Sequence, residues 1–273
     1  MTALAFLLGM AVGSFLNVCI HRWPRGESVV APRSRCPACG RQIAWRDNIP
    51  VLSYILLRGR CRSCGAAVPP RYLVVELATA SLFALIVLEL GAGLAAFKVA
   101  LLAAMLTILF FTDLEHFVLP DQVTLPGLLA GVAFSPFVPL RAGIAQAGCE
   151  LLGLHPAPWA VSLLESLASA LIFGGILYLT GEIFYRLRGV EGLGFGDVKL
   201  VAMLAAFQGS SEALLVLLAS CLLATLYGTA AVLSGRRRWR SPLPLGSYLA
   251  CAGIAAIFCA DDILNRYWDL VLE

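Results

Sequence analysis

Two aspartates stand at the ends of apolar segments, where carboxylates could carry out acid–base chemistry. Asp113 follows the apolar run 101–112, and Asp197 lies in the glycine-rich segment 192–199 at the start of another apolar stretch. A carboxylate near the hydrocarbon region of a membrane is costly and is retained mainly for function. Two such carboxylates that meet can share one proton and activate a water molecule. We therefore expect Asp113 and Asp197 to form one site.

Other polar residues leave part of this assignment open. Asp121 and Asp113 could face the same side of a helix that Pro120 interrupts, so spacing alone does not choose between them. Asp121 and Lys199 are candidates for a supporting role. Glu76 follows a basic loop and could meet a positively charged substrate segment, or it could cap a helix or pair with an arginine of that loop.

Two glycines beside Asp197 predict a special backbone. Gly194 and Gly196 would let the main chain approach an extended substrate strand, or adopt dihedral angles closed to other residues. A G-x-G run can also bind a dinucleotide, but that site requires a preceding strand in a βαβ unit. An apolar helix precedes it here, so we expect an active-site loop.

Four cysteines in a polar loop have the spacing of a metal site. Cys36, Cys39, Cys61 and Cys64 form two C-x-x-C-G motifs separated by 21 residues. A two-residue insert lets both thiolates reach one tetrahedral zinc ion, and the following glycine eases the turn. Two disulfides are the alternative, but the arginines of the loop place it in the reducing cytoplasm. We expect structural Zn²⁺, because four thiolates close the coordination sphere.

The elements that must carry these residues are membrane helices. The 273 residues are 60% hydrophobic and 14% charged, and the mean hydropathy is +0.85. Soluble domains are about 25% charged, so this composition indicates an all-α polytopic membrane protein. We expect about eight transmembrane helices. They lie near residues 2–20, 72–90, 94–112, 123–140, 160–184, 211–233 and 244–260, with a short one at 198–207.

The basic residues orient these helices. Seventeen of the 20 lysines and arginines lie in three segments, at residues 22–71, 186–199 and 236–240. The positive-inside rule places these segments and the active site toward the cytoplasm, with both termini outside. The net charge of +3 is then topological, and no nucleic-acid partner is expected.

The pattern predicts four regions along the chain. They are a first transmembrane helix at 1–20, a cytoplasmic cysteine loop domain at 21–71, a helical core at 72–260 and a short periplasmic tail at 261–273.

Several motifs follow one another along nearly the whole chain. They are Gly13–Val18, Cys36–Gly40, Asn48–Ser53, Leu57–Cys61, Asp113 with Leu119–Asp121, and Gly194–Leu200. In this order they resemble the bacterial type IV prepilin peptidases, which are G-x-G-D intramembrane aspartyl proteases of the inner membrane. The resemblance departs in the segment 242–248, which has Ser247 where the family pattern has a second proline. This departure leaves the start of the last helix open.

The resemblance implies an activity and its residues. Members of the family cut the basic leader from type IV prepilins and type II secretion pseudopilins, and then methylate the new N-terminal amine with S-adenosylmethionine. It implies that Asp113 and Asp197 are the catalytic aspartates and that Asp121 is a neighbour. One carboxylate would act as general base toward water while the other, kept protonated, would donate to the scissile carbonyl.

Two other classes of function compete with this interpretation. In a proton-coupled transporter or channel, Asp113 and Asp197 would relay protons, although broken helices in duplicated halves would then be expected and no such repeat appears. In a non-enzymatic pilus or secretion assembly factor, the cysteine loop would bind a partner.

Overall fold

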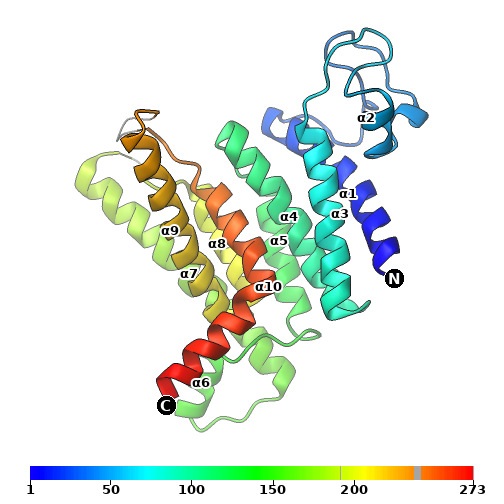
Figure 1. The fold of residues 1–273 in the computed structure, drawn as a ribbon. Helices are drawn as coiled ribbons and strands as arrows, with labels where there is room; N and C mark the ends of the chain where they lie inside the picture. Colours follow the sequence, from blue (N-terminus) through cyan, green and yellow to red (C-terminus); the bar gives the residue numbers. More distant parts are fainter. Residues whose placement is uncertain (191, 237–240, 273) are drawn as a thin grey trace. The chain divides into compact units, whose positions relative to one another are not determined.

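The computed structural model describes residues 1–190, 192–236 and 241–272 (Figure 1). The regular secondary structure of this part of the chain is helical apart from two isolated β-bridges. The basic segment 236–240 lies outside the described residues beyond Arg236. The chain divides into two compact units, Met1–Ile108 and Leu109–Glu273, and the boundary falls within helix α4 (Leu94–His116).

Among the described residues, six helices are long and apolar enough to cross a membrane. They are Thr2–Arg25, Arg71–Leu90, Leu94–His116, Pro158–Arg188, Ser210–Leu233 and Leu245–Val271. The segments expected near 123–140 and 198–207 form the shorter helices α5 (Asp121–Phe134) and α8 (Phe195–Gln208), of 14 residues each. A bilayer requires about 20 residues of helix. The prediction of an all-α polytopic membrane protein is therefore confirmed, with six helices of spanning length.

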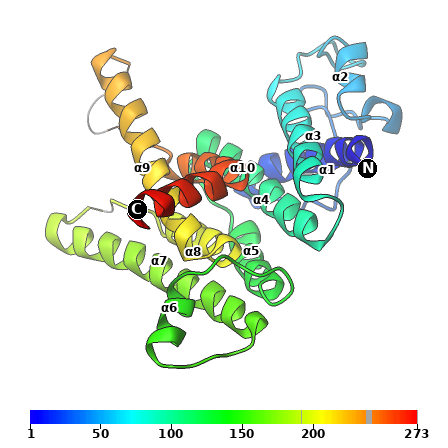
Figure 2. The ribbon, with the colours of Figure 1, turned by 60° about the horizontal axis from the view of Figure 1, so that its bottom comes forward.

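In the first unit, α1 (Thr2–Arg22) and α3 (Arg71–Leu90) lie side by side (Figures 1 and 2). Two glycines of α1 permit this close contact. A Cβ atom on Gly9 would lie 2.6 Å from Ala80 Cα, and one on Gly13 would lie 2.8 Å from Glu76 Cα. Any side chain at these glycines would push the helices apart, as expected where small residues form a membrane helix interface.

The polar loop between α1 and α3 contains three short helices. They are η1 (Trp23–Arg25), η2 (Trp45–Asp47) and α2 (Leu52–Leu56). The rest of the loop is irregular apart from the two β-bridges, which pair Arg35 with Gln42 and Arg60 with Ala67.

The second unit is built around α8. Its neighbours are α5, α7 (Pro158–Arg188), α9 (Ser210–Leu233) and α10 (Leu245–Leu272), and Figure 2 shows α8 between α5 and α7. Every residue of α8 from Met203 to Gln208 is buried, as expected for a helix that is apolar on all sides. The chain passes from α8 into α9 through Gly209, whose φ of 86° suits glycine.

Two features of this unit differ from the expectations. The short helix α6 (Ile144–Leu151) was not predicted, and residues 261–272 continue α10 rather than forming a separate tail. A buried carboxylate fixes α6: Glu165 of α7 accepts the backbone N–H of Ala145 at 2.7 Å and that of Ser210, which begins α9, at 3.0 Å. Glu165 therefore satisfies unpaired donors at two helix starts.

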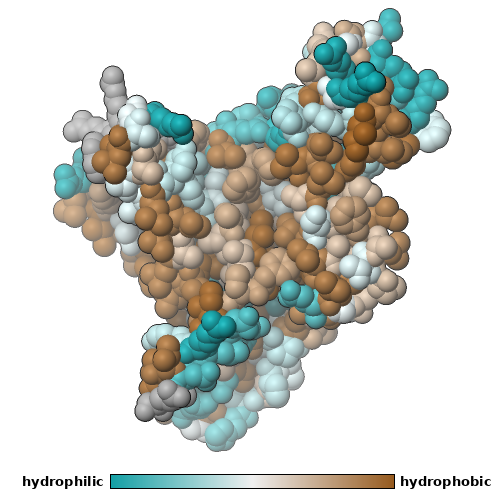
Figure 3. Space-filling model, viewed as in Figure 1, coloured by the Kyte–Doolittle hydropathy of each residue, from teal (hydrophilic) through white to brown (hydrophobic). Residues whose placement is uncertain are grey.

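The surface agrees with a membrane setting. Hydrophobic residues cover much of the long helices on the face shown in Figure 3, and hydrophilic residues gather mainly at helix ends and loops. Large apolar side chains such as Leu171, Leu218 and Leu129 are more than half exposed. Soluble monomers rarely expose contiguous apolar surface on this scale, so lipid is the natural covering for these helices.

Candidate active site and cysteine cluster

Asp113 lies in the last turn of α4 and is held by the first turn of α10. Its side chain is buried, with 6% of its surface exposed. Its Oδ2 accepts the backbone N–H of Ser247 at 2.7 Å, and the Ser247 hydroxyl oxygen lies 3.0 Å from the same atom. The first N–H groups of a helix have no partner within the helix and favour negative charge. The start of α10 is therefore a binding site for the Asp113 carboxylate.

Asp197 lies in the first turn of α8 and is half-buried. Gly194 caps this helix with extended backbone, and its carbonyl accepts the N–H of Asp197 at 3.0 Å. The two aspartates belong to the same unit, and they are close enough for the charge of Asp113 to act on Asp197. The structure thus brings together two carboxyl groups that are 84 residues apart in the sequence.

Leu119 packs between the start of α8, which carries Asp197, and the start of α10, which binds Asp113. A Cβ atom on Gly196 of α8 would lie 3.0 Å from Leu119 Cβ, and one on Gly246 of α10 would lie 2.9 Å from the Leu119 methyl groups and 3.1 Å from Asp113 Cγ. Contacts of this length leave no room for a side chain at either glycine. Gly246 and Gly196 therefore let α10 and α8 approach one another around Leu119.

The two glycines of the G-x-G-D segment act through close contact rather than unusual dihedral angles. Gly194 has φ of −74° and ψ of 141°, values open to other residues. A Cβ atom there would lie 3.3 Å from Asp197 Oδ2. The backbone does come close to neighbours at both Gly194 and Gly196, but these neighbours are Asp197 and Leu119 of the chain itself. The expected approach to a substrate strand stays a prediction.

Asp121 and Lys199 form an ion pair at the edge of this site. Asp121 begins α5 with a side chain that is 56% exposed, and the Lys199 side chain, 18% exposed, contacts its Oδ1. The Lys199 ammonium also lies 5.1 Å from the centre of the Phe195 ring. Asp121 is thus paired with the Lys199 ammonium and exposed to solvent, whereas Asp113 is the buried carboxylate near Asp197.

The four cysteines of the first unit form one cluster. All are free thiols, and their sulfur atoms lie within 4.8 Å of one another, with Cys36 and Cys64 3.8 Å apart. A tetrahedral Zn²⁺ with bonds of about 2.3 Å holds its sulfur ligands about 3.8 Å apart. The donor set and its spacing therefore fit a metal ion, and the free thiols count against the disulfide alternative.

The two halves of this cluster are built alike. Gly40 donates to the Cys36 carbonyl at 2.8 Å and Gly65 to the Cys61 carbonyl at 2.9 Å. Both glycines have positive φ, at 68° and 73°, which confirms that they ease tight turns. The backbone N–H groups of Cys64 and Ser63 point to the Cys61 sulfur and lower the pKa of that thiol to about 6. The Ala66 N–H lowers the pKa of Cys64, but burial and the neighbouring cysteines outweigh it and raise that pKa to about 11. The backbone thus favours the thiolate, which is the metal-binding form, at Cys61.

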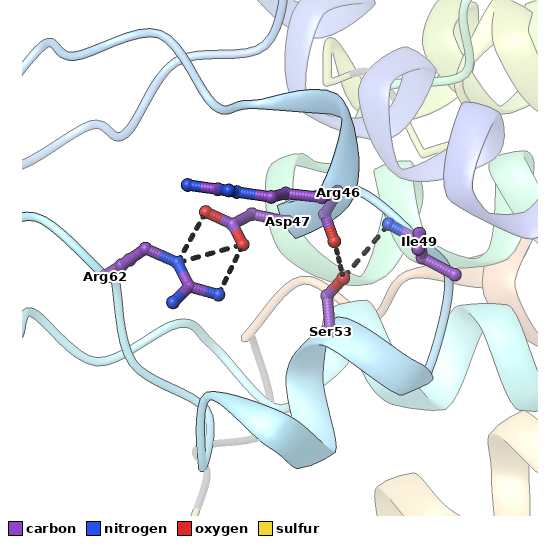
Figure 4. Close-up of polar contacts among 5 residues, drawn as sticks. All are labelled: Arg46, Asp47, Ile49, Ser53 and Arg62. Atoms are coloured by element: carbon purple, nitrogen blue, oxygen red, sulfur yellow. Dashed lines mark hydrogen bonds and ion pairs between the residues drawn. The ribbon is translucent and has the colours of Figure 1, made fainter.

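Polar contacts join the rest of the loop to the second cysteine pair (Figure 4). Arg62, between Cys61 and Cys64, binds both carboxylate oxygens of Asp47, with distances from 2.7 to 3.0 Å. Ser53 of α2 donates its hydroxyl to the Arg46 carbonyl and accepts the Ile49 N–H. The Arg62 contact lowers the pKa of Asp47. Helices η2 and α2 are thereby tied to the cysteine cluster.

Glu76 fastens this loop to α3. The Glu76 side chain is buried, and its Oε2 accepts the Val51 N–H at 2.7 Å. Val51 has φ of 62° and ψ of −51°, and the Leu52 N–H reaches the Pro50 carbonyl at 2.6 Å, which is the strained form of γ-turn. A β-branched residue in this conformation is rare and requires support from its surroundings. Of the roles considered for Glu76, the structure shows a backbone-capping contact.

Comparison with known proteins identifies the family. Residues 7–90 match the bacterial peptidase A24 N-terminal domain, and residues 100–229 match the type IV leader peptidase family. The chain belongs to this leader peptidase family. That membership argues against the transporter, channel and assembly-factor alternatives, because it places the two aspartates in a peptidase.

Relatives similar over most of their length support this conclusion, and each carries the name prepilin leader peptidase/N-methyltransferase. The protein of Aeromonas salmonicida is 34% identical over 99% of this chain and 94% of its own. That of Burkholderia pseudomallei is 35% identical over 94% of this chain and 84% of its own, and that of Pseudomonas aeruginosa is 34% identical over 96% and 91%. No solved structure matches the chain.

Three contacts of the site were not expected from the sequence. They are the Ser247 donors to Asp113, the packing of Leu119 between two glycines, and the capping of Val51 by Glu76. A signal existed for Ser247, because that residue is where the sequence departs from the family pattern. The departure left the start of the last helix open, and in the structure this helix, α10, begins at Leu245.

Proposed function

We propose that this protein is a membrane-embedded prepilin leader peptidase and N-methyltransferase in which Asp113 and Asp197 are the catalytic pair. Its substrates are type IV prepilins or type II secretion pseudopilins, from which it removes the basic leader. The observation that carries this proposal is the pairing of buried Asp113 with Asp197 at the meeting of α4, α8 and α10, in a chain of the leader peptidase family.

The hydrolysis follows from two carboxyl groups that share one proton. The ionised carboxylate takes a proton from a water molecule, and the resulting hydroxide attacks the scissile carbonyl carbon. The protonated carboxyl donates to the carbonyl oxygen, and a proton then passes to the amine as the C–N bond breaks. Proton transfers at Asp113 and Asp197 suffice, so no covalent enzyme intermediate is required.

The second reaction uses the amine that cleavage exposes. S-adenosylmethionine, as methyl donor, would supply a methyl group on a sulfonium sulfur. The neutral amine would attack the methyl carbon, the C–S bond would break to release the neutral thioether S-adenosylhomocysteine, and the methylated amine would lose one proton to solvent. The names of the relatives imply this reaction. We assign it to the same protein, and the aspartate pair does not take part in methyl transfer.

We assign a structural Zn²⁺ to Cys36, Cys39, Cys61 and Cys64. The support is the geometry of the cluster, whose four sulfur atoms fit one tetrahedral ion. When bound, zinc supplies a closed cross-link and leaves no open position for water. The cysteines would thereby hold the loop domain 21–71 together, because a loop of this size cannot bury a sufficient hydrophobic core.

We place the protein in the bacterial inner membrane, with the cysteine loop and the aspartate pair toward the cytoplasm and both termini outside. This orientation requires the short helices α5 and α8 to cross the membrane along with the six long helices. The helical core at 72–260 then contacts lipid. The arginines in residues 22–71 support this orientation. Labelling of Cys36 or Cys61 by an impermeant thiol reagent from the periplasm of intact cells, after metal removal, would contradict it.

The test of the activity is direct. The purified protein is incubated with a synthetic prepilin and S-adenosylmethionine, and the products are examined by mass spectrometry. We expect cleavage at the leader junction and addition of a methyl group to the new N-terminus. A wild-type protein that leaves the prepilin intact would contradict the peptidase assignment, and cleavage without added methyl would contradict the transferase assignment.

A further inference from the structure

The two carboxyl groups of the pair have unequal surroundings. Asp113 Oδ2 faces two groups of Ser247, the backbone N–H at 2.7 Å and the hydroxyl at 3.0 Å. Among the described residues, the electrostatic partners of the Asp197 carboxyl are the Gly194 backbone and the charge of Asp113. The N–H of Asp197 itself points away, to the Gly194 carbonyl. Asp113 thus has more donors than Asp197.

The Ser247 hydroxyl has two possible acceptors and one proton. Its oxygen lies 3.0 Å from Asp113 Oδ2 and 3.0 Å from the Phe110 carbonyl. With Asp113 ionised, the hydroxyl can donate to Oδ2 beside the backbone N–H. With Asp113 protonated, the hydroxyl turns to Phe110 and accepts from the acid. The backbone N–H cannot turn in this way, so it favours the ionised state at all times.

The position of Ser247 in its helix adds to this preference. It is the third residue of α10, which begins at Leu245, so its N–H has no acceptor within the helix. This N–H is shared between Asp113 Oδ2 at 2.7 Å and the Pro244 carbonyl at 3.2 Å, and the shorter contact is the one to the carboxylate. A negative charge at this end of a helix is favoured by the aligned peptide dipoles. When two carboxyl groups share one proton, the group with more donors stays ionised.

We propose that Ser247 is a positioning residue that holds Asp113 ionised as the general base and leaves the shared proton on Asp197, the general acid. This inference rests on the proposed catalytic pair. Both donors occupy Oδ2, so Oδ1 is the oxygen of Asp113 that activates the water. Hydrolysis then begins with a proton moving from water to Asp113 and continues with a proton moving from Asp197 to the carbonyl oxygen.

The other charged groups near the pair leave this assignment intact. On α8, Lys199 is engaged by Asp121 at the start of α5. On α4, the His116 ring lies 3.9 Å from the Glu115 carboxylate. Helix α10 carries no charged side chain before Asp261. Asp113 is the more buried of the two aspartates, which by itself disfavours its charged form. The donors of Ser247 are therefore the feature that offsets this burial and favours the ionised state of Asp113.

Three substitutions at Ser247 separate the effects of its two hydrogen-bond donors, the hydroxyl and the backbone N–H. Ser247→Ala removes the hydroxyl and keeps the N–H, whereas Ser247→Thr keeps both. Ser247→Pro removes both, and proline is tolerated in the first turn of a helix. Ser220→Ala is the matched control, because Ser220 is a buried serine of the same unit whose hydroxyl, among the described residues, bonds the Leu217 carbonyl of its own helix. Each variant is assayed for prepilin cleavage across pH in detergent.

We expect the acid limb of the pH profile, where the base becomes protonated, to move upward in Ser247→Ala by about one pH unit. The shift should be larger in Ser247→Pro and absent in Ser247→Thr and in the control. The alkaline limb, where the acid loses its proton, should stay in place. The loss at the acid side should fall on kcat, with KM within about twofold, because substrate binding is unchanged.

Two results would overturn the inference. If the alkaline limb moves instead of the acid limb, Asp197 is the base; if neither limb moves in the alanine and proline variants, Ser247 does not set the proton position. For a variant whose cleavage is too slow to assay, the infrared C=O band of the protonated carboxyl is measured as a function of pH. This band shows whether the pH at which a carboxyl group loses its proton differs from that in the wild type. Cleavage by Asp113→Asn would instead contradict the catalytic pair itself.

Discussion

The cysteine loop of the first unit and the aspartate pair of the second unit both assemble distant residues, but they do so by different physical means. In the loop, two nearly identical turns present thiols, and each turn is closed by its own backbone bonds and a glycine at positive φ. In the second unit, the starts of α8 and α10 pack against Leu119, and α10 holds Asp113 where its charge acts on Asp197. Short sequence motifs determine the local geometry of the loop, whereas the positions of the helix ends depend on packing along whole helices.

The buried carboxylates show the same contrast. Glu165 accepts backbone or hydroxyl donors from α6, α7 and α9, with Ser169 at 3.1 Å adding to Ala145 and Ser210. Glu76 accepts the N–H of strained Val51. Both carboxylates are engaged in holding segments together. Asp113 differs because its Oδ2 takes the donors of Ser247 while its neighbour is another acid, which is an arrangement suited to proton transfer rather than to cross-linking.

The largest effect should come from removing titration at either aspartate. Asp113→Asn and Asp197→Asn should each lower prepilin cleavage by about 10³-fold or more, because asparagine keeps the size and loses the proton exchange. Metal content and methylation of a peptide that is already cleaved should stay near wild type. Mass spectrometry of the cleavage and methylation products measures whether the aspartate substitutions affect cleavage alone.

Asp121→Asn is the matched control for this comparison. Loss of the Asp121 charge removes an exposed ion pair with Lys199, so the rate of cleavage should fall only a few-fold. If Asp121→Asn abolished cleavage while Asp113→Asn retained it, the pair would be Asp121 with Asp197. Loss of both cleavage and methylation in well-folded aspartate variants would argue that the two reactions use one inseparable site.

The next largest effect should come from the cysteine cluster. Replacing Cys36, Cys39, Cys61 or Cys64 with serine should release the metal and loosen residues 21–71, since folding of small metal sites is coupled to metal binding. Elemental analysis and limited proteolysis check the two outcomes. The aspartate pair should remain in place, because its contacts come from the second unit. Wild-type protein without about one equivalent of zinc would refute the metal assignment.

A smaller effect should follow from crowding the helix ends. Gly246→Ala places a methyl group 2.9 Å from Leu119 and 3.1 Å from Asp113, so one of these groups must move. A displacement of about 1 Å at a catalytic group can cost 10²-fold in rate, and we expect a loss of that order in kcat. Gly175→Ala is the control, since a Cβ atom there meets nothing within 4 Å. Equal activity of the two variants would argue against tight packing around Asp113.

The smallest effect should come from the exposed pair Asp47 and Arg62. Because Arg62 lowers the pKa of Asp47, this contact stabilises the loop above the ordinary pKa of aspartate and is lost as pH falls through the lowered value. Asp47→Asn should therefore slightly increase proteolysis of the loop at neutral pH. The difference from wild type should vanish once the pH is below the lowered pKa. A difference that persists there would point to a contact other than the ion pair.

The sequence alone determined the features that depend on short spacing and composition. Two C-x-x-C-G motifs predict the sulfur cluster because two-residue inserts bring thiols together locally, and the structure confirms the cluster. Apolar runs predict the helices because backbone groups in lipid must bond within their own segment. The order of motifs along the chain predicted the leader peptidase family, which the comparisons confirm.

Only the tertiary structure distinguished the acids and revealed the groups that hold them. Asp113 and Asp121 are equivalent by spacing, but folding buries the first beside Asp197 and exposes the second to Lys199. The contacts of Ser247, Leu119 and Glu165 join segments separated by up to 134 residues, and no local pattern encodes such contacts. They exist because helix ends have unpaired donors and because packed helices leave space for particular side chains only, which are properties of the assembled chain.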